Sequence, residues 1–184
     1  MVFKNHKNIE GQHAMFGASK YAWVSYDEQK LIQTYYSIQQ AKKGTELHEY
    51  AAMAIRLGQR CPKSNKTICR YINDGISFQM TPEQPLFYSE NFFGTADCIS
   101  FHDDLLRIHD LKTGIIPAKM TQLEIYATFF CLEYHIKPSD IEMELRIYQN
   151  DEVVIHNPDP DSIVELMDKT IEFDRVLTRL KTEG

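Results

Sequence analysis

The sequence has 184 residues, 43% of them hydrophobic, and a formal net charge of −6. Its length and hydrophobic content can fill one core, so we expect a single domain over residues 1–184. No apolar run reaches the length of a membrane helix, and the start of the chain lacks the hydrophobic region of a signal peptide, which predicts a cytoplasmic protein with no membrane partner.

The cysteines argue for a reducing compartment. No two of them form a CxxC pair, which argues against the common zinc modules. We therefore expect free thiols at all of these positions. They are Cys61, Cys69, Cys98 and Cys131.

Helical signals dominate the first part of the chain. A short helix is predicted from Ser19, longer helices over residues 27–40 and 42–57, and another short helix over residues 64–73. Asp27 is a typical residue for opening a helix, and Gly58 is a typical left-handed residue after one. Gly75 is expected to end the last of these helices.

After Gly75 the hydrophobic pattern changes to the period of two that marks β-strands. Strands are predicted over residues 86–89, 95–101, 105–111, 142–148 and 153–156, with a tight turn at residues 102–104. Thr121 is expected to cap a helix over residues 122–134, and Ser162 a final amphipathic helix. Helices, a run of strands, a helix and further strands predict an α/β fold with a mixed central sheet flanked by helices.

Asp97 and Asp110 lie on two neighbouring predicted strands joined by a short turn. Because side chains alternate along a strand, Lys112 projects on the same face as Asp110, and Leu111 turns to the core. Two carboxylates that converge beside an ammonium group form a hard-oxygen site for a divalent cation, with a positive charge aimed at an anion. The pattern therefore favours hydrolysis of phosphodiesters.

Together with two further motifs, these residues resemble the PD-(D/E)XK nucleases, and within them the RecB-like exonuclease branch. The four motifs occur in order as Gly44-Thr-Glu-Leu-His48, Gly94-Thr-Ala-Asp97, Asp110-Leu-Lys112-Thr-Gly114 and Gln122-Leu-Glu-Ile-Tyr126. An upstream segment, residues 14–23, looks like the serine and tryptophan opening of the same family. The resemblance implies a restriction-endonuclease-like αβββαβ core.

The resemblance also implies roles for the site residues. Lys112 would stabilise the transition state, Gln122 and Tyr126 would act beside it from the following helix, and Glu90 is a candidate auxiliary carboxylate. The implied cofactor is Mg²⁺ or Mn²⁺. Its implied ligands are His48, Asp97, Asp110 and the main-chain carbonyl of Leu111.

The implied activity is metal-dependent hydrolysis of DNA, most naturally by an exonuclease of recombination, repair or phage DNA metabolism. No iron–sulfur cluster is expected, because relatives that hold one carry three cysteines near the C-terminus and no cysteine follows Cys131 here. Strandedness, polarity and the choice between DNA and RNA stay open. The alternatives are a non-catalytic nucleic-acid-binding module on a nuclease scaffold, and a subunit that cuts only with a recombination or helicase partner.

Each site residue also has a plain structural interpretation. Asp110 and Lys112 could form an exposed ion pair of little energetic value, and His48 could be an ordinary helix histidine. Gln122 and Tyr126 are four apart and would be neighbours on any helix surface. The apolar residues around Asp110 argue against the first alternative, because a buried strand seldom holds charges without a purpose.

One stretch of the chain concentrates positive charge. Residues 51–73 contain no acidic residue, and their basic residues are Arg56, Arg60, Lys63, Lys66 and Arg70. Such a run either contacts phosphates or forms a solvated face. Because it follows the His48 helix directly, we expect it to line a path for DNA.

Overall fold

The computed structural model describes Lys7 and residues 14–183, so most of the segment used for the signal-peptide prediction lies outside the described residues. The described residues divide into two compact units, one that ends at Lys43 and one that begins at Gly44. The expectation of a single domain stays a prediction. None of the helices among the described residues has both the length and the apolar character needed to cross a membrane.

In the first unit, the 3₁₀ helix η2 spans Ala18–Ser25, where a short helix was expected. The indole of Trp23 donates a hydrogen bond to the carbonyl of Gly17 at 3.1 Å. The carboxylate of Asp27 accepts a hydrogen bond from the backbone N–H of Lys30 at 2.7 Å, so it opens the next helix as predicted.

Helix α1 runs without interruption over Glu28–Arg56, so the predicted break between residues 40 and 42 is wrong. The residues there are glutamine, alanine and lysine, all of which favour a helix. Gly58 follows the helix with a φ of 64°, the left-handed conformation expected of it.

Helix α2 spans Thr67–Ser77, and Gly75 lies inside it instead of ending it. A Cβ atom at Gly75 would lie 2.7 Å from Cδ1 of Ile55 on α1. The glycine therefore serves close packing between α1 and α2, which a local sequence pattern does not distinguish from a helix end.

The described residues form one five-stranded sheet in the order β1-β2-β3-β4-β5. β1, β2 and β3 are antiparallel neighbours, β3 and β4 are parallel, and β4 and β5 are antiparallel. The strands are β1 (Thr81–Ser89), β2 (Phe92–His102), β3 (Leu105–Leu111), β4 (Glu142–Gln149) and β5 (Glu152–His156). The predicted mixed sheet is confirmed, with β3 at its centre.

The strand bounds show where local patterns are informative. β3 has the predicted bounds, and the turn before it places Asp103 and Asp104 at positive φ, as a tight hairpin requires. β1 begins at Thr81, well before the predicted residue 86. Pro82 and Pro85 argue locally against a strand, so the sequence pattern does not reveal this first part of β1. Both prolines are tolerated because β1 is an edge strand.

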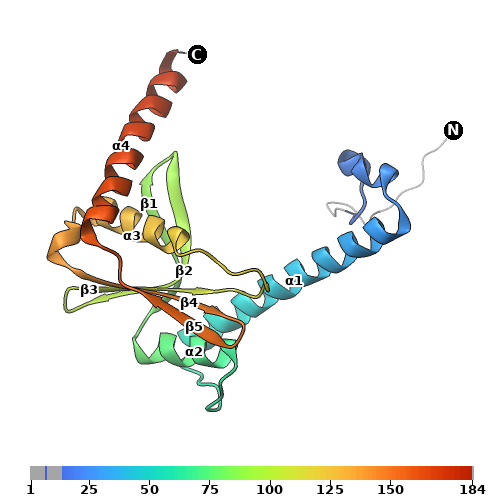
Figure 1. Cartoon of the computed structure of the whole chain (residues 1–184), viewed down its shortest axis with the longest axis horizontal. Coiled ribbons are helices and arrows are strands. Elements are labelled where there is room, and N and C mark those ends of the chain that lie inside the picture. Colours follow the sequence, from blue (N-terminus) through green and yellow to red (C-terminus); the bar gives the residue numbers. More distant parts are fainter. Residues whose placement is uncertain (1–6, 8–13, 184) are drawn as a thin grey trace. The chain divides into compact units, whose positions relative to one another are not determined.

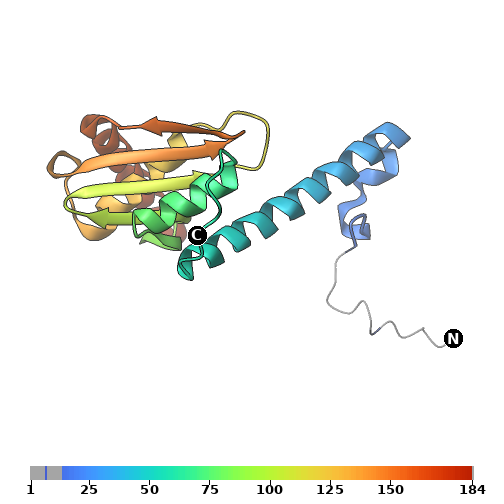
Figure 2. The same cartoon turned by 90° about the horizontal axis from the view of Figure 1, so that it is seen from below.

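Helices cover both faces of the sheet, as predicted (Figures 1 and 2). Helix α3 (Thr121–Tyr134) and the start of α4 (Pro160–Glu183) pack on one face, and α2 with the last turns of α1 on the other. Neither predicted cap is present. Thr121 is already inside α3, and α4 begins before Ser162, at Pro160.

Candidate metal centre and catalytic residues

Asp97 and Asp110 lie side by side on β2 and β3. Cys98 pairs with His109 in the ladder, and the same register places the next residues, Asp97 and Asp110, opposite each other. Oδ2 of Asp97 accepts a hydrogen bond from the backbone N–H of Leu111 at 3.0 Å. The two carboxylates are close enough for the charge of Asp97 to raise the pKa of Asp110, but Asp110 lies outside the group of candidate ligand atoms that the described residues form around Asp97.

The carboxylate of Asp110 is buried, and only one of its two oxygens has a partner. Its residue is 2% exposed, Oδ1 lies 3.0 Å from Nζ of Lys112, and Oδ2 has no hydrogen-bond partner. Burial raises the pKa of the Asp110 carboxyl, and the charge of Asp97 raises it further, while Lys112 acts in the opposite direction. The positive charge of Lys112 therefore does not fully offset the effects of burial and of the Asp97 charge on the Asp110 carboxyl.

A chain of hydrogen bonds positions Lys112. Its Nζ reaches Asp110 and also donates to Oε1 of Gln122 at 2.9 Å, so the predicted common face of residues 110 and 112 is confirmed. Nε2 of Gln122 donates to the hydroxyl of Tyr126 at 3.2 Å, one helical turn further along α3. The amide of Gln122 is therefore fixed from both ends.

The glycines of two motifs make room for side chains of the other two. A Cβ atom at Gly44 would lie 2.8 Å from Oγ1 of Thr113, and one at Gly94 would lie 2.9 Å from Cε1 of Tyr126. Real Cβ atoms almost never approach other atoms this closely. The four motifs are thus in contact with one another as well as ordered along the chain.

His48 and Glu83 complete a group of potential metal ligands around Asp97. Nδ1 of His48 lies 3.4 Å from Oδ2 of Asp97, and this hydrogen bond raises the pKa of the imidazole. One ligand atom from each of His48, Glu83 and Asp97 lies within 4.8 Å of the others. Burial, reinforced by the charge of Asp97, raises the pKa of the Glu83 carboxyl.

Glu83 was not among the predicted ligands. It lies on β1, between Pro82 and Gln84, which pair with Cys98 and Ala96 on either side of Asp97. Its φ of 54° is rare for a residue with a side chain and interrupts the alternation that a sequence pattern relies on. Glu83 is itself exposed, and the predicted auxiliary residue, Glu90, lies elsewhere, in the turn between β1 and β2.

The residues present fit a hard divalent cation. Carboxylate oxygens are the preferred ligands of Mg²⁺ and Mn²⁺, and a cation would supply the positive charge that Glu83 and Asp110 lack. The free Oδ2 of Asp110 offers a further oxygen without breaking a hydrogen bond. Coordination by the carbonyl of Leu111 stays a prediction.

The loop between β3 and α3 is held by one side chain from β4. Nε2 of Gln149 donates to the carbonyls of Gly114 and Ile116, at 2.5 and 2.8 Å, and its Oε1 accepts from the N–H of Ala118 at 3.0 Å. The side chains of Ile115 and Ile116 are 84% and 81% exposed. The loop after Lys112 is thus anchored at its backbone and presents apolar groups to solvent.

The basic run is less free to bind phosphate than expected. Arg56 donates to the carbonyl of Pro82 at 3.2 Å, and Arg60 donates to Oγ of Ser77 at 3.0 Å. Asp151 engages two others: Nζ of Lys66 lies 2.8 Å from its carboxylate, and Arg70 donates to its carbonyl at 3.3 Å. Lys63 is exposed on the loop before α2.

A comparison with known protein families, curated proteins and solved structures finds no match for this chain.

Proposed function

We propose that this chain is a metal-dependent nuclease that hydrolyses DNA phosphodiester bonds, with the αβββαβ core of the restriction-endonuclease-like fold. Helices α1 and α2 precede three antiparallel strands, and α3 follows them before β4, which is parallel to β3, and this order supports that core. The observation that carries the proposal is Asp110, a buried carboxylate between Asp97 and Lys112 with one oxygen free. Buried polar atoms are usually hydrogen-bonded, so an oxygen left free beside a second carboxylate supports a role in binding a cation.

The residues divide into ligands and positioning groups. His48, Glu83, Asp97 and Asp110 would hold Mg²⁺ or Mn²⁺, which when bound polarises a phosphoryl oxygen and provides an activated water at neutral pH. Lys112 keeps a positive charge beside Asp110, where charge develops on the phosphate in the transition state. Gln122 fixes the ammonium group of Lys112, and Tyr126 fixes Gln122.

An exonuclease of recombination, repair or phage DNA metabolism remains the preferred biological setting. A second candidate is an enzyme that needs a partner to hold DNA. The ion pair of Lys66 and the hydrogen bonds that hold Arg56, Arg60 and Arg70 within the chain favour it, because these side chains are less available to contact DNA phosphates.

The test is incubation of the pure protein with end-labelled linear DNA and with circular DNA, in Mg²⁺, Mn²⁺ or EDTA. We expect metal-dependent cleavage by the wild type, none in EDTA, and none by Asp110→Asn. Asp151→Asn, which removes a carboxylate that contacts a different lysine, serves as the matched control. Cleavage of linear but not circular DNA identifies an exonuclease, and cleavage that persists in Asp110→Asn contradicts the proposal.

A further inference from the structure

Two of the four cysteines lie on neighbouring segments at one end of α2. Cys69 belongs to the first turn of α2, and Cys61 lies on the loop that leads from α1 to α2. All four are free thiols, as expected, but only these two are partly exposed, whereas Cys98 and Cys131 are buried. Small molecules in solution can therefore reach the thiols of Cys61 and Cys69.

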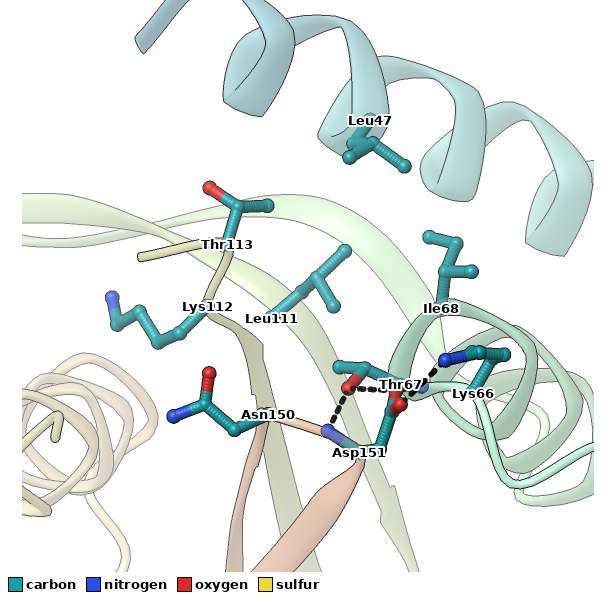
Figure 3. Close-up of a pocket in the computed structure, with 9 residues that line it drawn as sticks. All are labelled: Leu47, Lys66, Thr67, Ile68, Leu111, Lys112, Thr113, Asn150 and Asp151. Atoms are coloured by element: carbon teal, nitrogen blue, oxygen red, sulfur yellow. Dashed lines mark hydrogen bonds and ion pairs between the residues drawn. The ribbon is translucent and has the colours of Figure 1, made fainter. Parts of the chain in front are cut away.

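The first turn of α2 is fixed against the turn between β4 and β5. The carboxylate of Asp151 accepts hydrogen bonds from the backbone N–H of Thr67 at 2.9 Å, from its hydroxyl at 3.1 Å and from Nζ of Lys66 at 2.8 Å (Figure 3). Cys69 comes two residues after Thr67 on the same turn. The backbone that carries the Cys69 thiol is thus held in place.

The backbone of Cys61 is held against the same helix by Asn73. The side-chain amide of Asn73 accepts a hydrogen bond from the N–H of Cys61 at 3.0 Å and donates one to the carbonyl of Cys61 at 3.1 Å. Cys69 and Asn73 are four residues apart on α2, so their side chains are neighbours on one face of the helix. Cys61 therefore lies against the face of α2 that carries Cys69.

The two thiols also interact with each other. Burial raises the pKa of the Cys61 thiol, and a hydrogen bond with the thiol of Cys69 raises it further, while a hydrogen bond with the hydroxyl of Tyr50 acts in the opposite direction. A disulfide joins cysteines whose Cβ atoms lie about 3.5–4.5 Å apart. Two cysteines whose backbones are held side by side and whose thiols share a hydrogen bond are close to this arrangement.

We propose that Cys61 and Cys69 form a reversible disulfide when the protein meets a small organic disulfide, for which oxidised glutathione is the probe. The thiolate of one cysteine attacks a sulfur of the oxidant and releases one glutathione. The other cysteine then attacks the protein sulfur of this mixed disulfide and releases the second glutathione. The protein loses two electrons and two protons, and the oxidant becomes two thiols. In a reducing compartment such a bridge is transient, as redox-sensing disulfides are.

The bridge would close the loop of residues 61–69, which contains Lys63 and Lys66 of the basic run. Closing a loop of this length restricts the unfolded chain, so the oxidised protein should melt about 5 °C above the reduced protein. If the bridged protein does not melt higher, the bridge strains the fold, which contradicts the positioning of the two cysteines. Formation of the bridge does not depend on the proposed nuclease activity.

Mass spectrometry of the pure full chain tests the proposal directly. The reduced protein is equilibrated with mixtures of reduced and oxidised glutathione, and the remaining thiols are alkylated under denaturing conditions. Lysine or arginine residues flank both cysteines, so trypsin should release the peptides 61–63 and 67–70 joined by a disulfide that dithiothreitol breaks. Glutathione adducts without the joined peptides, or a bridge to another cysteine, would overturn the proposal.

Two variants of α2 test the role of Asn73. Asn73→Ala keeps both thiols and removes both hydrogen bonds to Cys61, so half formation of the bridge should require at least about tenfold more oxidised glutathione. Ser77→Ala, one turn further along, removes only a hydrogen bond from Arg60 and should match the wild type. Cys69→Ser should carry a glutathione adduct on Cys61 and yield no joined peptides. Equal sensitivity of Asn73→Ala and the wild type would contradict the pairing by Asn73.

Discussion

The carboxylates of Asp110 and Asp151 each contact a lysine, yet their surroundings shift the two carboxyl pKa values in opposite directions. The Asp110–Lys112 distance is 3.0 Å and the Asp151–Lys66 distance is 2.8 Å. Burial raises the pKa of the Asp110 carboxyl. Hydrogen bonds from Lys66 and Thr67 lower the pKa of the Asp151 carboxyl to about 2. Distance to a cation therefore does not decide what a carboxylate can do.

The difference lies in what remains unsatisfied. Asp151 accepts hydrogen bonds from Lys66 and Thr67 on an exposed surface, so it is stable as it stands. Asp110 is buried, faces the like charge of Asp97 and keeps Oδ2 without a partner. A buried carboxylate in this state gains more from an added cation than an exposed one does. The Asp110–Lys112 pair is therefore suited to binding a cation, and the Asp151–Lys66 pair to holding α2 against the β4–β5 turn.

Removing each carboxylate should give the largest contrast. Asp110→Asn should reduce DNA cleavage by at least about a thousandfold, because it removes one member of a group that acts as a unit. Its thermal stability should not fall, because the variant relieves a buried charge repulsion. Asp151→Asn should cleave DNA at nearly the wild-type rate. Similar losses of cleavage in both variants would refute the contrast.

Removing each lysine should give a smaller but still large contrast. Lys112→Met should lower turnover by about a hundredfold, as expected when a preorganised transition-state charge is lost. Metal affinity, measured by calorimetry, should be kept or raised, because a neighbouring positive charge is gone. Lys66→Met serves as control and should change neither quantity. Collapse of metal affinity in Lys112→Met would mean that Lys112 is structural.

Glu83, which the sequence analysis did not predict as a ligand, offers a third comparison. Glu83→Gln should weaken Mn²⁺ binding by at least about tenfold, because Glu83 belongs to the ligand group around Asp97. Glu90→Gln changes a carboxylate on the exposed turn between β1 and β2, and should bind Mn²⁺ as the wild type does. Isothermal titration of both variants, with circular dichroism to verify folding, distinguishes them. Equal affinities would remove Glu83 from the site.

The pairing of Lys66 with Asp151 also changes the expectation for the basic run. On single-stranded DNA, each phosphate contact contributes about −0.7 to the slope of log affinity against log salt. Lys63→Ala should therefore reduce the slope by about 0.7, whereas Lys66→Ala should leave it almost unchanged, because Asp151 already neutralises Lys66. Binding titrations in EDTA over a range of salt concentrations measure both slopes. A loss in Lys66→Ala equal to that in Lys63→Ala would show that Lys66 exchanges Asp151 for phosphate.

The smallest effect is expected on stability in acid. Because the pKa of Asp151 is lower in the folded state than its ordinary value of 3.8, its contribution is fully present above about pH 4 and is lost as the pH falls through about 2. Asp151→Asn lacks this contribution, so its stability should decline slightly less than that of the wild type between pH 4 and pH 2. Urea denaturation at several pH values measures the difference. Parallel curves would show that the Lys66 contact contributes nothing.

The sequence was sufficient where the chemistry is local. Alternation along β3 predicted that Asp110 and Lys112 share a face, and their contact confirms it. The spacing of Gln122 and Tyr126 predicted neighbours on one helix face, and their hydrogen bond confirms it. The mixed sheet followed from the order of helical and strand patterns.

Sequence reasoning failed where residues far apart in the chain determine the outcome. Asp151 occupies Lys66 from 85 residues away, so a basic run that looks free along the sequence is partly paired. Glu83 is hidden because Pro82 and its own positive φ interrupt the strand pattern. Gly75 looks like a helix end, but the space it leaves is filled by Ile55. Packing decides each of these cases.

The contacts of Gln149 bear on when the candidate site forms during protein synthesis. The four motifs are complete once residue 126 has been made, but the N–H of Lys112 is bonded to the carbonyl of Tyr148, and the loop after it is held by Gln149. A nascent chain that ends before Glu142 has every motif residue and no parallel partner for β3. Because strand β4 holds Lys112 and its loop, the proposed nuclease activity should arise only after β4 has left the ribosome, well after the last motif has been translated.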